Sequence, residues 1–141
     1  MHNANLLKDE LWKGFRIDVQ EFLPDGFMVH AWDKRKLCAG YAKVSVHRQQ
    51  AKLGDIYVLD RLLPRFKWCP WYKPRINYRN QGLGSQILRC VIIQCHILGI
   101  HELSGEIVGD REALTLFYRR HGFSINGTVI TLDLHSLRGR S

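Results

Sequence analysis

Arg79-Asn80-Gln81-Gly82-Leu83-Gly84-Ser85-Gln86 is the stretch of sequence that decides the fold. Apolar residues recur at helical spacing directly after it, at Ile87, Leu88, Val91, Ile92, Cys95 and Leu98. Glycines at the start of a helix let the backbone approach a ligand closely. The first amides of such a helix are unpaired, and the helix dipole adds positive potential there. The stretch therefore predicts a phosphate site, to which Arg79 can add charge-assisted bonds.

Two common phosphate-binding motifs are absent from this stretch. A Walker A loop needs Gly-Lys-Ser/Thr after its second glycine, whereas the chain has Gly84-Ser85-Gln86. A dinucleotide fingerprint needs a third glycine three residues beyond the second, and Ile87 occupies that position. A glycine-rich turn that only starts a helix is the alternative that the stretch itself leaves open.

Upstream of the glycine stretch, apolar and polar residues alternate with the period of half-buried strands. The strands that this pattern predicts are 15–20, 27–32, 37–47 and 53–59. The first two are joined by the turn Leu23-Pro24-Asp25-Gly26, where proline fixes φ and glycine accepts a positive φ. Residues 5–13 are predicted to form a short helix. The first half is therefore expected to be an antiparallel meander.

Downstream, the predicted helix ends near Gly99, and a strand is expected over 103–108. Asp110 is expected to cap a second helix that runs to about Arg120. Asn126-Gly127 then predicts a hairpin between two short strands. The order β-β-β-β-α-β-α-β-β indicates an α+β fold with helices packed on a mostly antiparallel sheet.

Length and composition predict one domain over residues 1–141, because the chain is short and its hydrophobic content of 45% is ordinary for a globular protein. The segment 135–141 is expected to be a frayed tail. No apolar run reaches the roughly 18 residues that a membrane span needs. Residues 1–14 contain too many polar groups for a signal peptide. We therefore expect a cytoplasmic protein without a membrane partner, either a monomer or a homodimer.

The formal charge of +8 is unevenly distributed. The interval between Asp60 and Glu102 contains no acidic residue, and its basic residues are Arg61, Arg65, Lys67, Lys73, Arg75, Arg79 and Arg89. Such a patch favours an anionic partner, namely nucleic acid, a membrane surface or a phosphorylated ligand. A solvated basic face is the alternative.

The cysteine spacing argues against a metal site. Cys38, Cys69, Cys90 and Cys95 include no pair with the two-residue spacing of a zinc knuckle, and no two histidines stand at i and i+4. We expect reduced, mostly buried thiols and no metal.

Three segments together resemble the GNAT superfamily of N-acetyltransferases. Arg79-x-x-Gly82-x-Gly84 is similar to its Arg/Gln-x-x-Gly-x-Gly/Ala signature. Asp55-Ile56-Tyr57-Val58 resembles its fourth strand, and residues 117–123, Phe-Tyr-Arg-Arg-His-Gly-Phe, resemble its last helix. The matches fall in family order, over residues 38–134. The resemblance implies a GNAT-like mixed sheet in which strands four and five are parallel but splayed into a wedge.

The resemblance also implies acetyl-CoA as co-substrate and a primary amine as acceptor, joined by direct attack in a ternary complex. The strand edge Ile56, Tyr57, Val58 and Leu59 would pair with the pantetheine, and the amide near Leu59 would act as the oxyanion donor. The diphosphate would lie on the glycine stretch, at Arg79, Asn80, Gln81, Gly82, Leu83, Gly84 and Ser85.

Tyr118 matches the tyrosine that protonates the departing CoA thiolate in this family, whereas a core tyrosine on an apolar helix face is the alternative. The sequence leaves the identity of the general base open. Asp55 and Asp60 flank the fourth strand and are the nearest acidic candidates, although water alone can also serve. His121 is expected to end the helix, and a catalytic role for it is the lesser alternative.

The chain departs from the family pattern at two places. Only residues 23–26 separate the first two predicted strands, where the family has two helices that wall the acceptor site. An insert over 61–76 precedes the glycine stretch, with five basic residues, four aromatics and three prolines that disfavour regular structure. The aromatics can fold back as a lid, or can stack on nucleic acid. A CoA-binding or nucleic-acid-binding module without turnover is therefore the alternative function.

Overall fold

The computed structural model describes residues 6–22, 25–58, 60–62, 75–77 and 82–134, with the backbone alone for Phe22, Asp55, 60–62 and 75–77. The helices and strands run in the order β1 Glu10–Trp12, β2 Phe15–Phe22, β3 Gly26–Trp32, β4 Cys38–His47, β5 Gln50–Val58, β6 Asp60–Leu62, β7 Arg75–Asn77, α1 Leu83–Ile97, β8 Glu102–Glu106, α2 Arg111–Arg120, β9 Ser124–Asn126 and β10 Val129–Asp133.

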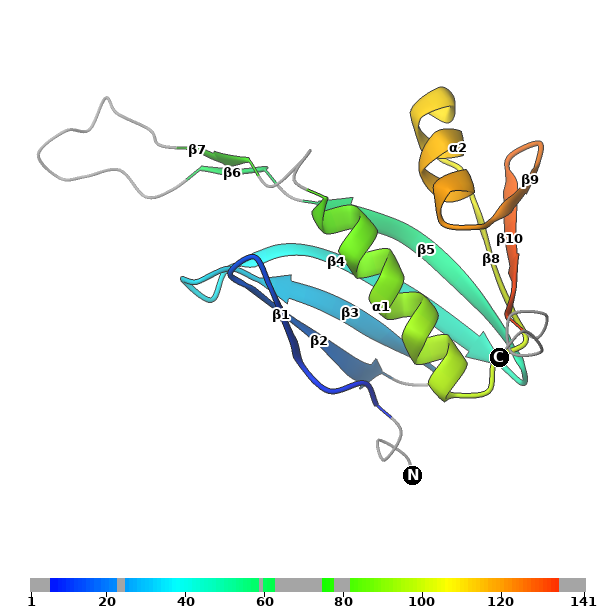
Figure 1. Ribbon diagram of the computed structural model, residues 1–141, viewed down its shortest axis with the longest axis horizontal. Helices are drawn as coiled ribbons and strands as arrows, with labels where there is room; N and C mark the ends of the chain where they lie inside the picture. The colour runs from blue at the N-terminus through cyan, green and yellow to red at the C-terminus, as the bar shows by residue number, and fades with distance from the viewer. Residues whose placement is uncertain (1–5, 23–24, 59, 63–74, 78–81, 135–141) are drawn as a thin grey trace, which may run out of the picture.

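Eight strands form one sheet in the order β1-β2-β3-β4-β5-β8-β10-β9. Every neighbouring pair is antiparallel except β5 and β8, which are parallel. Helix α1 crosses one face of the sheet and packs against β3, β4 and β5 (Figure 1). The predicted α+β fold with a mostly antiparallel sheet is confirmed.

The core lies between α1 and the sheet. On β3, Phe27, Val29 and Ala31 are at most 1% exposed, and on α1 Ile87 is fully buried. Buried and exposed side chains alternate along each strand, because successive side chains point to opposite faces of the sheet. One face of the sheet is therefore apolar and the other is polar. Gly40 of β4 allows the close packing, because a Cβ there would lie 2.6 Å from the Tyr57 carbonyl oxygen and 3.0 Å from Ile87 Cδ1.

The predicted helix over residues 5–13 is wrong, because its second half is strand β1. Lys13 and Gly14 have φ values of 49° and 86°, as in a two-residue type I′ turn, and Trp12 pairs with Phe15. The backbone N–H of Leu7 donates to Oε1 of the buried Gln94 at 2.7 Å. This segment therefore lies extended against α1, and its apolar residues do not form one helical face.

Two boundaries differ from the prediction. The fourth predicted strand begins at Gln50, because Arg48, with φ of 58°, helps turn the chain directly after β4. Asn126 pairs with Val129, so the two-residue turn is Gly127-Thr128 and lies one residue later than predicted. Only Gly127 has a positive φ there, 65°, as in a type II′ turn.

Both helix caps agree with the prediction. Asp110 Oδ1 accepts a hydrogen bond from the Ala113 N–H at 3.2 Å, which satisfies one of the free amides of α2. Gly99 follows α1 with φ of 77°, the left-handed conformation typical of a residue that ends a helix.

The two ends of the insert are strands, where irregular structure was predicted. β6 and β7 form a separate antiparallel ribbon with Asp60 opposite Asn77, and Figure 1 shows this ribbon on the left, beyond one end of the strands of the large sheet. Residues 63–74 lie outside the described residues, as do the predicted tail 135–141 and the aromatics expected to form a lid or a nucleic-acid contact. Those predictions remain predictions.

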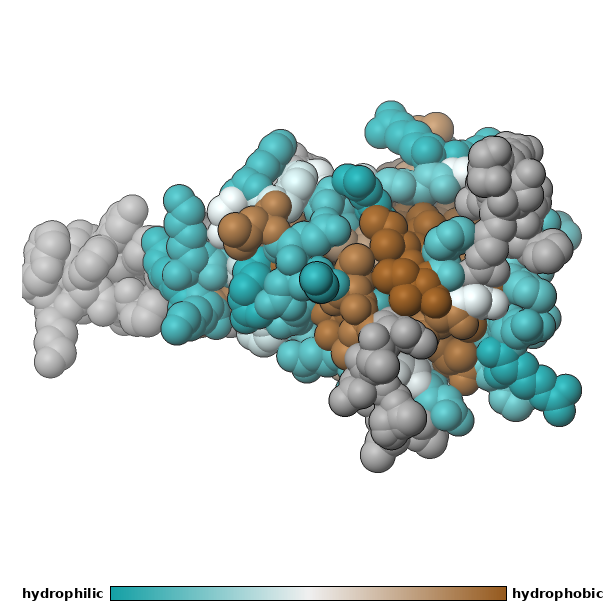
Figure 2. All heavy atoms as spheres, turned by 60° about the horizontal axis from the view of Figure 1, so that its bottom comes forward, coloured by the Kyte–Doolittle hydropathy of each residue, from teal (hydrophilic) through white to brown (hydrophobic). Residues whose placement is uncertain are grey.

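Apolar surface is gathered rather than scattered on the face that Figure 2 views, with polar surface on both sides of it. The large apolar side chains that remain more than 40% exposed include Leu11, Tyr57, Ile97, Val108, Leu116 and Val129. Neither described helix is long and apolar enough to cross a membrane.

Candidate functional site

Strands β5 and β8 are paired only at one end. Their parallel pairing stops at Leu53 opposite Gly105, although β5 continues its pairing with β4 to Val58 opposite Gly40. Gly54 and Asp55 lie in an irregularity where two residues of β5 oppose Lys43 alone, and such a bulge bends a strand. Beyond the bulge, no described strand pairs with residues 56–58 on the β8 side. The predicted wedge is therefore present.

A cleft of about 260 Å³ occupies the opening between the splayed strands. Its lining comes from β5, β8, the segment after β8, and both helices, at Ile56, Tyr57, Val58, Gly84, Glu106, Val108, Leu114, Phe117 and Tyr118. Four predicted site residues, Ile56, Tyr57, Val58 and Gly84, thus meet Tyr118 in one place. The cleft is slightly smaller than typical small-molecule pockets and is mostly apolar in its side chains.

The phenol of Tyr118 is held in a fixed position at the cleft. The residue is 5% exposed, and its ring makes edge contacts with Phe117 and Phe123 at centroid distances of 5.1 and 5.3 Å. The Phe123 N–H donates to the Tyr118 carbonyl oxygen at 3.1 Å, which anchors the end of α2. A buried aromatic ring in such contacts has little freedom to change rotamer.

Helix α1 begins beside the cleft with a residue that lacks a side chain. Gly82 is its N-cap with φ of 82° and offers no capping hydrogen bond, and the first turn contains no acidic residue. Leu83, 1% exposed, anchors this end of the helix in the core. A Cβ at Gly84 would lie 3.7 Å from Val58 Cγ2 and 3.8 Å from Phe117 Cζ. The uncapped amides and the positive end of the dipole favour an anion here.

His121 connects the two helices beside this position. Its Nε2 lies 3.1 Å from Ser85 Oγ in the first turn of α1, and its ring contacts Phe117 at 5.1 Å. Partial burial lowers the pKa of His121 below its ordinary value of 6.5, because burial disfavours the imidazolium. His121 therefore does more than end a helix, because it joins the last turn of α2 to the predicted diphosphate site.

Glu106 is the site residue that the sequence reasoning missed. It ends β8 opposite Val129, and it is the one acidic side chain among the described residues that line the cleft. Glu106 lies within the strand expected over 103–108, where it is the one charged residue. The sequence indicated Asp55 and Asp60 because they flank the fourth strand.

The remaining predicted site residues are not placed by the structure. Leu59, Arg79, Asn80 and Gln81 lie outside the described residues. Asp55 and Asp60 are described by their backbone alone, in β5 and β6. Among the described side chains, no three metal-ligating residues cluster.

Known structures share this arrangement. The fold is similar to the ribosomal-protein-S18-alanine N-acetyltransferase from Escherichia coli, with a TM-score of 0.59 and 20% identity over 77% of this chain and 68% of that chain. It is similar to the PaiA N-acetyltransferase from Thermoplasma acidophilum, solved in complex with coenzyme A, with a TM-score of 0.57 and 16% identity over 77% of this chain and 61% of that chain.

Mutant forms of the spermidine/spermine N-acetyltransferase from Vibrio cholerae give a TM-score of 0.60 at 13% identity, over 84% of this chain and 73% of that chain. No protein-family model and no curated protein matches the chain. The structural neighbours are consistently GNAT-family acetyltransferases, so the chain has the GNAT fold. The implied fold is confirmed, and the two helices that the family has between its first two strands are replaced here by the short β2–β3 connection.

Proposed function

We propose that this chain is an N-acetyltransferase that moves an acetyl group from acetyl-CoA to a primary amine by direct attack in a ternary complex. The observation that carries the proposal is the cleft between splayed strands, with Tyr118 and Glu106 in its lining and the uncapped start of α1 beside it. An uncapped helix start suits a diphosphate, and a strand that diverges from its neighbour leaves room for an extended amide chain such as pantetheine.

The residues that would hold acetyl-CoA come from two elements. The backbone of Ile56, Tyr57 and Val58 lies where β5 diverges from β8, and Leu59, which follows them, would supply the oxyanion donor. Gly82, Leu83, Gly84 and Ser85 would cradle the diphosphate, with Arg79, Asn80 and Gln81 before them. Bound there, acetyl-CoA supplies a thioester, whose acyl carbon is open to attack by an amine.

Tyr118 would act as the general acid. As the new C–N bond forms and the C–S bond breaks, a thiolate departs and needs a proton. A phenol fixed in the cleft can donate that proton and so stabilise the leaving group. Burial among Phe117, Phe123 and the sheet also limits water at this position.

Glu106 would act as the general base, directly or through water. The attacking amine must lose a proton, and Glu106 places a carboxylate in the same cleft as Tyr118. Asp55 and Asp60 remain alternatives, because their backbone lies in β5 and in β6 directly after it. An acid and a base from different elements of the cleft would let the two protons move independently.

Thiol release from acetyl-CoA over a panel of amines and peptides tests the proposal. We expect Tyr118→Phe to lower kcat by about 10²-fold or more, with little change in KM for acetyl-CoA. Glu106→Gln should lower the rate, because the amide cannot accept the proton that the attacking amine loses. Leu116→Ala, an exposed position on α2, is the control and should leave the rate unchanged. Equal rates for wild type and Tyr118→Phe would remove Tyr118 from the mechanism.

A CoA-binding protein without turnover is the competing function. Calorimetry with acetyl-CoA separates the two, because heat of binding without thiol release for any acceptor would contradict catalysis. Binding that is lost in a Gly84→Val variant, whose larger side chain would project into the cleft, would place the ligand there.

A further inference from the structure

A row of directly paired residues crosses four strands on the face of the sheet opposite α1. Asp18 of β2 pairs with His30 of β3, His30 pairs with Tyr41 of β4, and Tyr41 pairs with Tyr57 of β5. The Tyr41 and Tyr57 rings stack at 5.0 Å, and the His30 and Tyr41 rings lie 6.2 Å apart. Directly opposed residues share a face, so the four side chains form one continuous line.

This row begins at the candidate active site. Tyr57 lines the cleft together with Tyr118 and is 46% exposed. Three strand spacings separate β5 from β2, which places Asp18 about 14 Å from Tyr57 across the sheet. The line therefore leads from the acyl-transfer cleft to a carboxylate at its far end.

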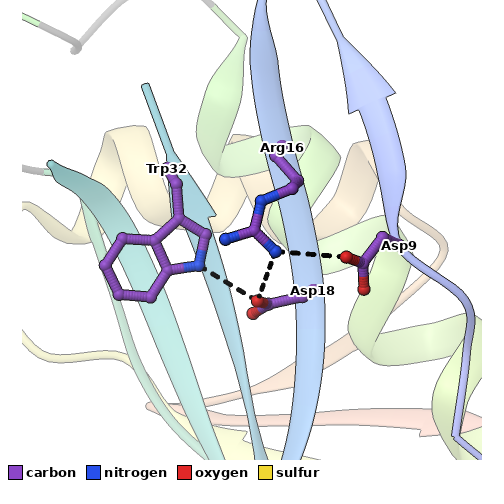
Figure 3. A network of polar contacts seen from close by, with 4 residues as sticks. All are labelled: Asp9, Arg16, Asp18 and Trp32. Atoms are coloured by element: carbon purple, nitrogen blue, oxygen red, sulfur yellow. Dashed lines mark hydrogen bonds and ion pairs between the residues drawn. The ribbon is translucent and has the colours of Figure 1, made fainter. Parts of the chain in front are cut away.

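Asp18 is an incompletely satisfied carboxylate. It is 8% exposed, and its Oδ2 accepts hydrogen bonds from Arg16 Nη1 at 3.0 Å and from Trp32 Nε1 at 3.2 Å (Figure 3). Its Oδ1 is buried and has no hydrogen-bond partner among the described residues. Nδ1 of His30, directly opposite, is in the same condition. Buried polar atoms without partners are costly, so a donor that gained access to this carboxylate past the half-exposed Arg16 side chain would be bound favourably.

The charges around Asp18 favour a cationic donor. Arg16 also forms an ion pair with Asp9 at 3.1 Å, so this guanidinium is shared between two carboxylates. The cluster of Asp9, Arg16 and Asp18 thus carries one net negative charge. Trp32 stacks on His30 at 5.3 Å and keeps the indole beside the carboxylate.

The shape of the face favours a polypeptide over a small molecule. Helix α1 packs on the other side of the sheet, and α2 packs mainly against β9, so neither described helix walls this row. Small-molecule sites are concave and bury most of the ligand. Side chains such as Tyr and Trp, which present an apolar body and a polar tip, are typical of protein interfaces. A chain of about four extended residues spans 14 Å.

We infer that the acceptor is the amine-bearing end of a polypeptide, which lies across Tyr57, Tyr41 and His30 and places a basic side chain against Asp18. This inference rests on the proposed function and adds the class of acceptor to it. The amine would enter the cleft from the row side. A lysine or arginine four to five residues further along would pair with the Asp18 carboxylate.

Fluorescence anisotropy with labelled peptides tests the inference, because it measures binding whether or not acetyl transfer occurs. The probe is a five-residue peptide with a free amino terminus, serines at the centre, lysine at position five and a fluorophore at the carboxyl end. One comparison peptide has glutamine at position five, and another has the lysine at position two. We expect wild type to bind the first peptide at least about tenfold more tightly than the other two.

Asp18→Asn should abolish this preference, because the amide keeps the acceptor for Trp32 and loses the charge. Asp9→Asn is the graded comparison: it removes an equal charge from the side of Arg16 away from the row but leaves the Asp18 carboxylate in place, so it should weaken the preference less than Asp18→Asn does. Circular dichroism checks that each variant is folded. If the wild-type protein binds the three peptides with equal affinity, the inference is overturned whatever the variants show.

The two proposals fail in different ways. Lysine-dependent binding through Asp18 without thiol release would support the acceptor surface and contradict the acetyltransferase. Thiol release that is indifferent to the position of the lysine would support the acetyltransferase and overturn the surface. Displacement of all peptides by spermine at equal concentration, with spermine acetylated in their place, would overturn the polypeptide in favour of a small polyamine.

Discussion

His121 Nε2 lies 3.1 Å from Ser85 Oγ, so the residue directly after α2 contacts the first turn of α1. The two residues are 36 positions apart in sequence. The contact fixes the distance between the helix that contains Tyr118 and the helix start that would bind the diphosphate. The contact thereby brings the proposed acid, Tyr118, close to the proposed anion site.

His121 should make the protein less stable as the pH falls. Burial lowers its pKa in the folded state below the 6.5 of the unfolded chain. Between these two pKa values the unfolded state binds more protons, so the free energy of unfolding decreases as pH decreases below about 6.5. Urea unfolding at pH 7.5 and pH 5.0 should therefore show a larger loss in wild type than in His121→Gln. An equal loss in both proteins would contradict the assignment.

Gly82→Ala should destabilise the protein by about 1–2 kcal/mol, because an L side chain is strained at a left-handed φ of 82°. Gly84→Ala is the matched control, since Gly84 has no such φ and its nearest contacts would be ordinary at 3.7 and 3.8 Å. Denaturant unfolding measures both. We expect no loss of stability for Gly84→Ala, and weaker acetyl-CoA binding if the proposed site is correct.

Gly40→Ala should lower the free energy of unfolding by about 1–3 kcal/mol, the usual cost of overpacking. The new Cβ would lie 2.6 Å from the Tyr57 carbonyl oxygen, so β4 and β5 would have to separate. Ser45→Ala, at an exposed position of the same strand, is the control. A Gly40→Ala protein as stable as wild type would show that the strands relax without cost.

Cys90 should resist thiol reagents at pH 8 in the native protein. Burial, together with the smaller effect of the Glu10 charge and against the opposing effect of Arg89, raises its pKa to about 11. The reactive thiolate is therefore scarce. Mass spectrometry after brief treatment with an aromatic disulfide should find Cys38, which is half-buried, modified before Cys90. Modification of Cys90 in urea verifies the reagent, and rapid native modification would contradict its burial.

The local patterns predicted most of the elements because each depends on nearby residues. The alternation of apolar and polar residues predicted β2, β3 and β4. The glycine stretch and the helical spacing of the apolar residues after it predicted α1. The helix predicted over 5–13 failed because its apolar residues fit both periods, and the turn at Lys13-Gly14 was overlooked. Glu106 was not among the predicted bases because that prediction used nearness in sequence to the fourth strand, whereas β8 comes beside β5 only in the folded sheet.

The sequence by itself determined where strands and helices form, which face of each is apolar, and that a glycine-started helix offers free amides. Those properties follow from backbone geometry and side-chain periodicity over a few residues. Only the tertiary structure decided that β5 and β8 diverge after Leu53, that Glu106 meets Tyr118, and that Asp18, His30, Tyr41 and Tyr57 form one row. Strand register and splay depend on packing between residues that are far apart in the chain, and local sequence does not encode them.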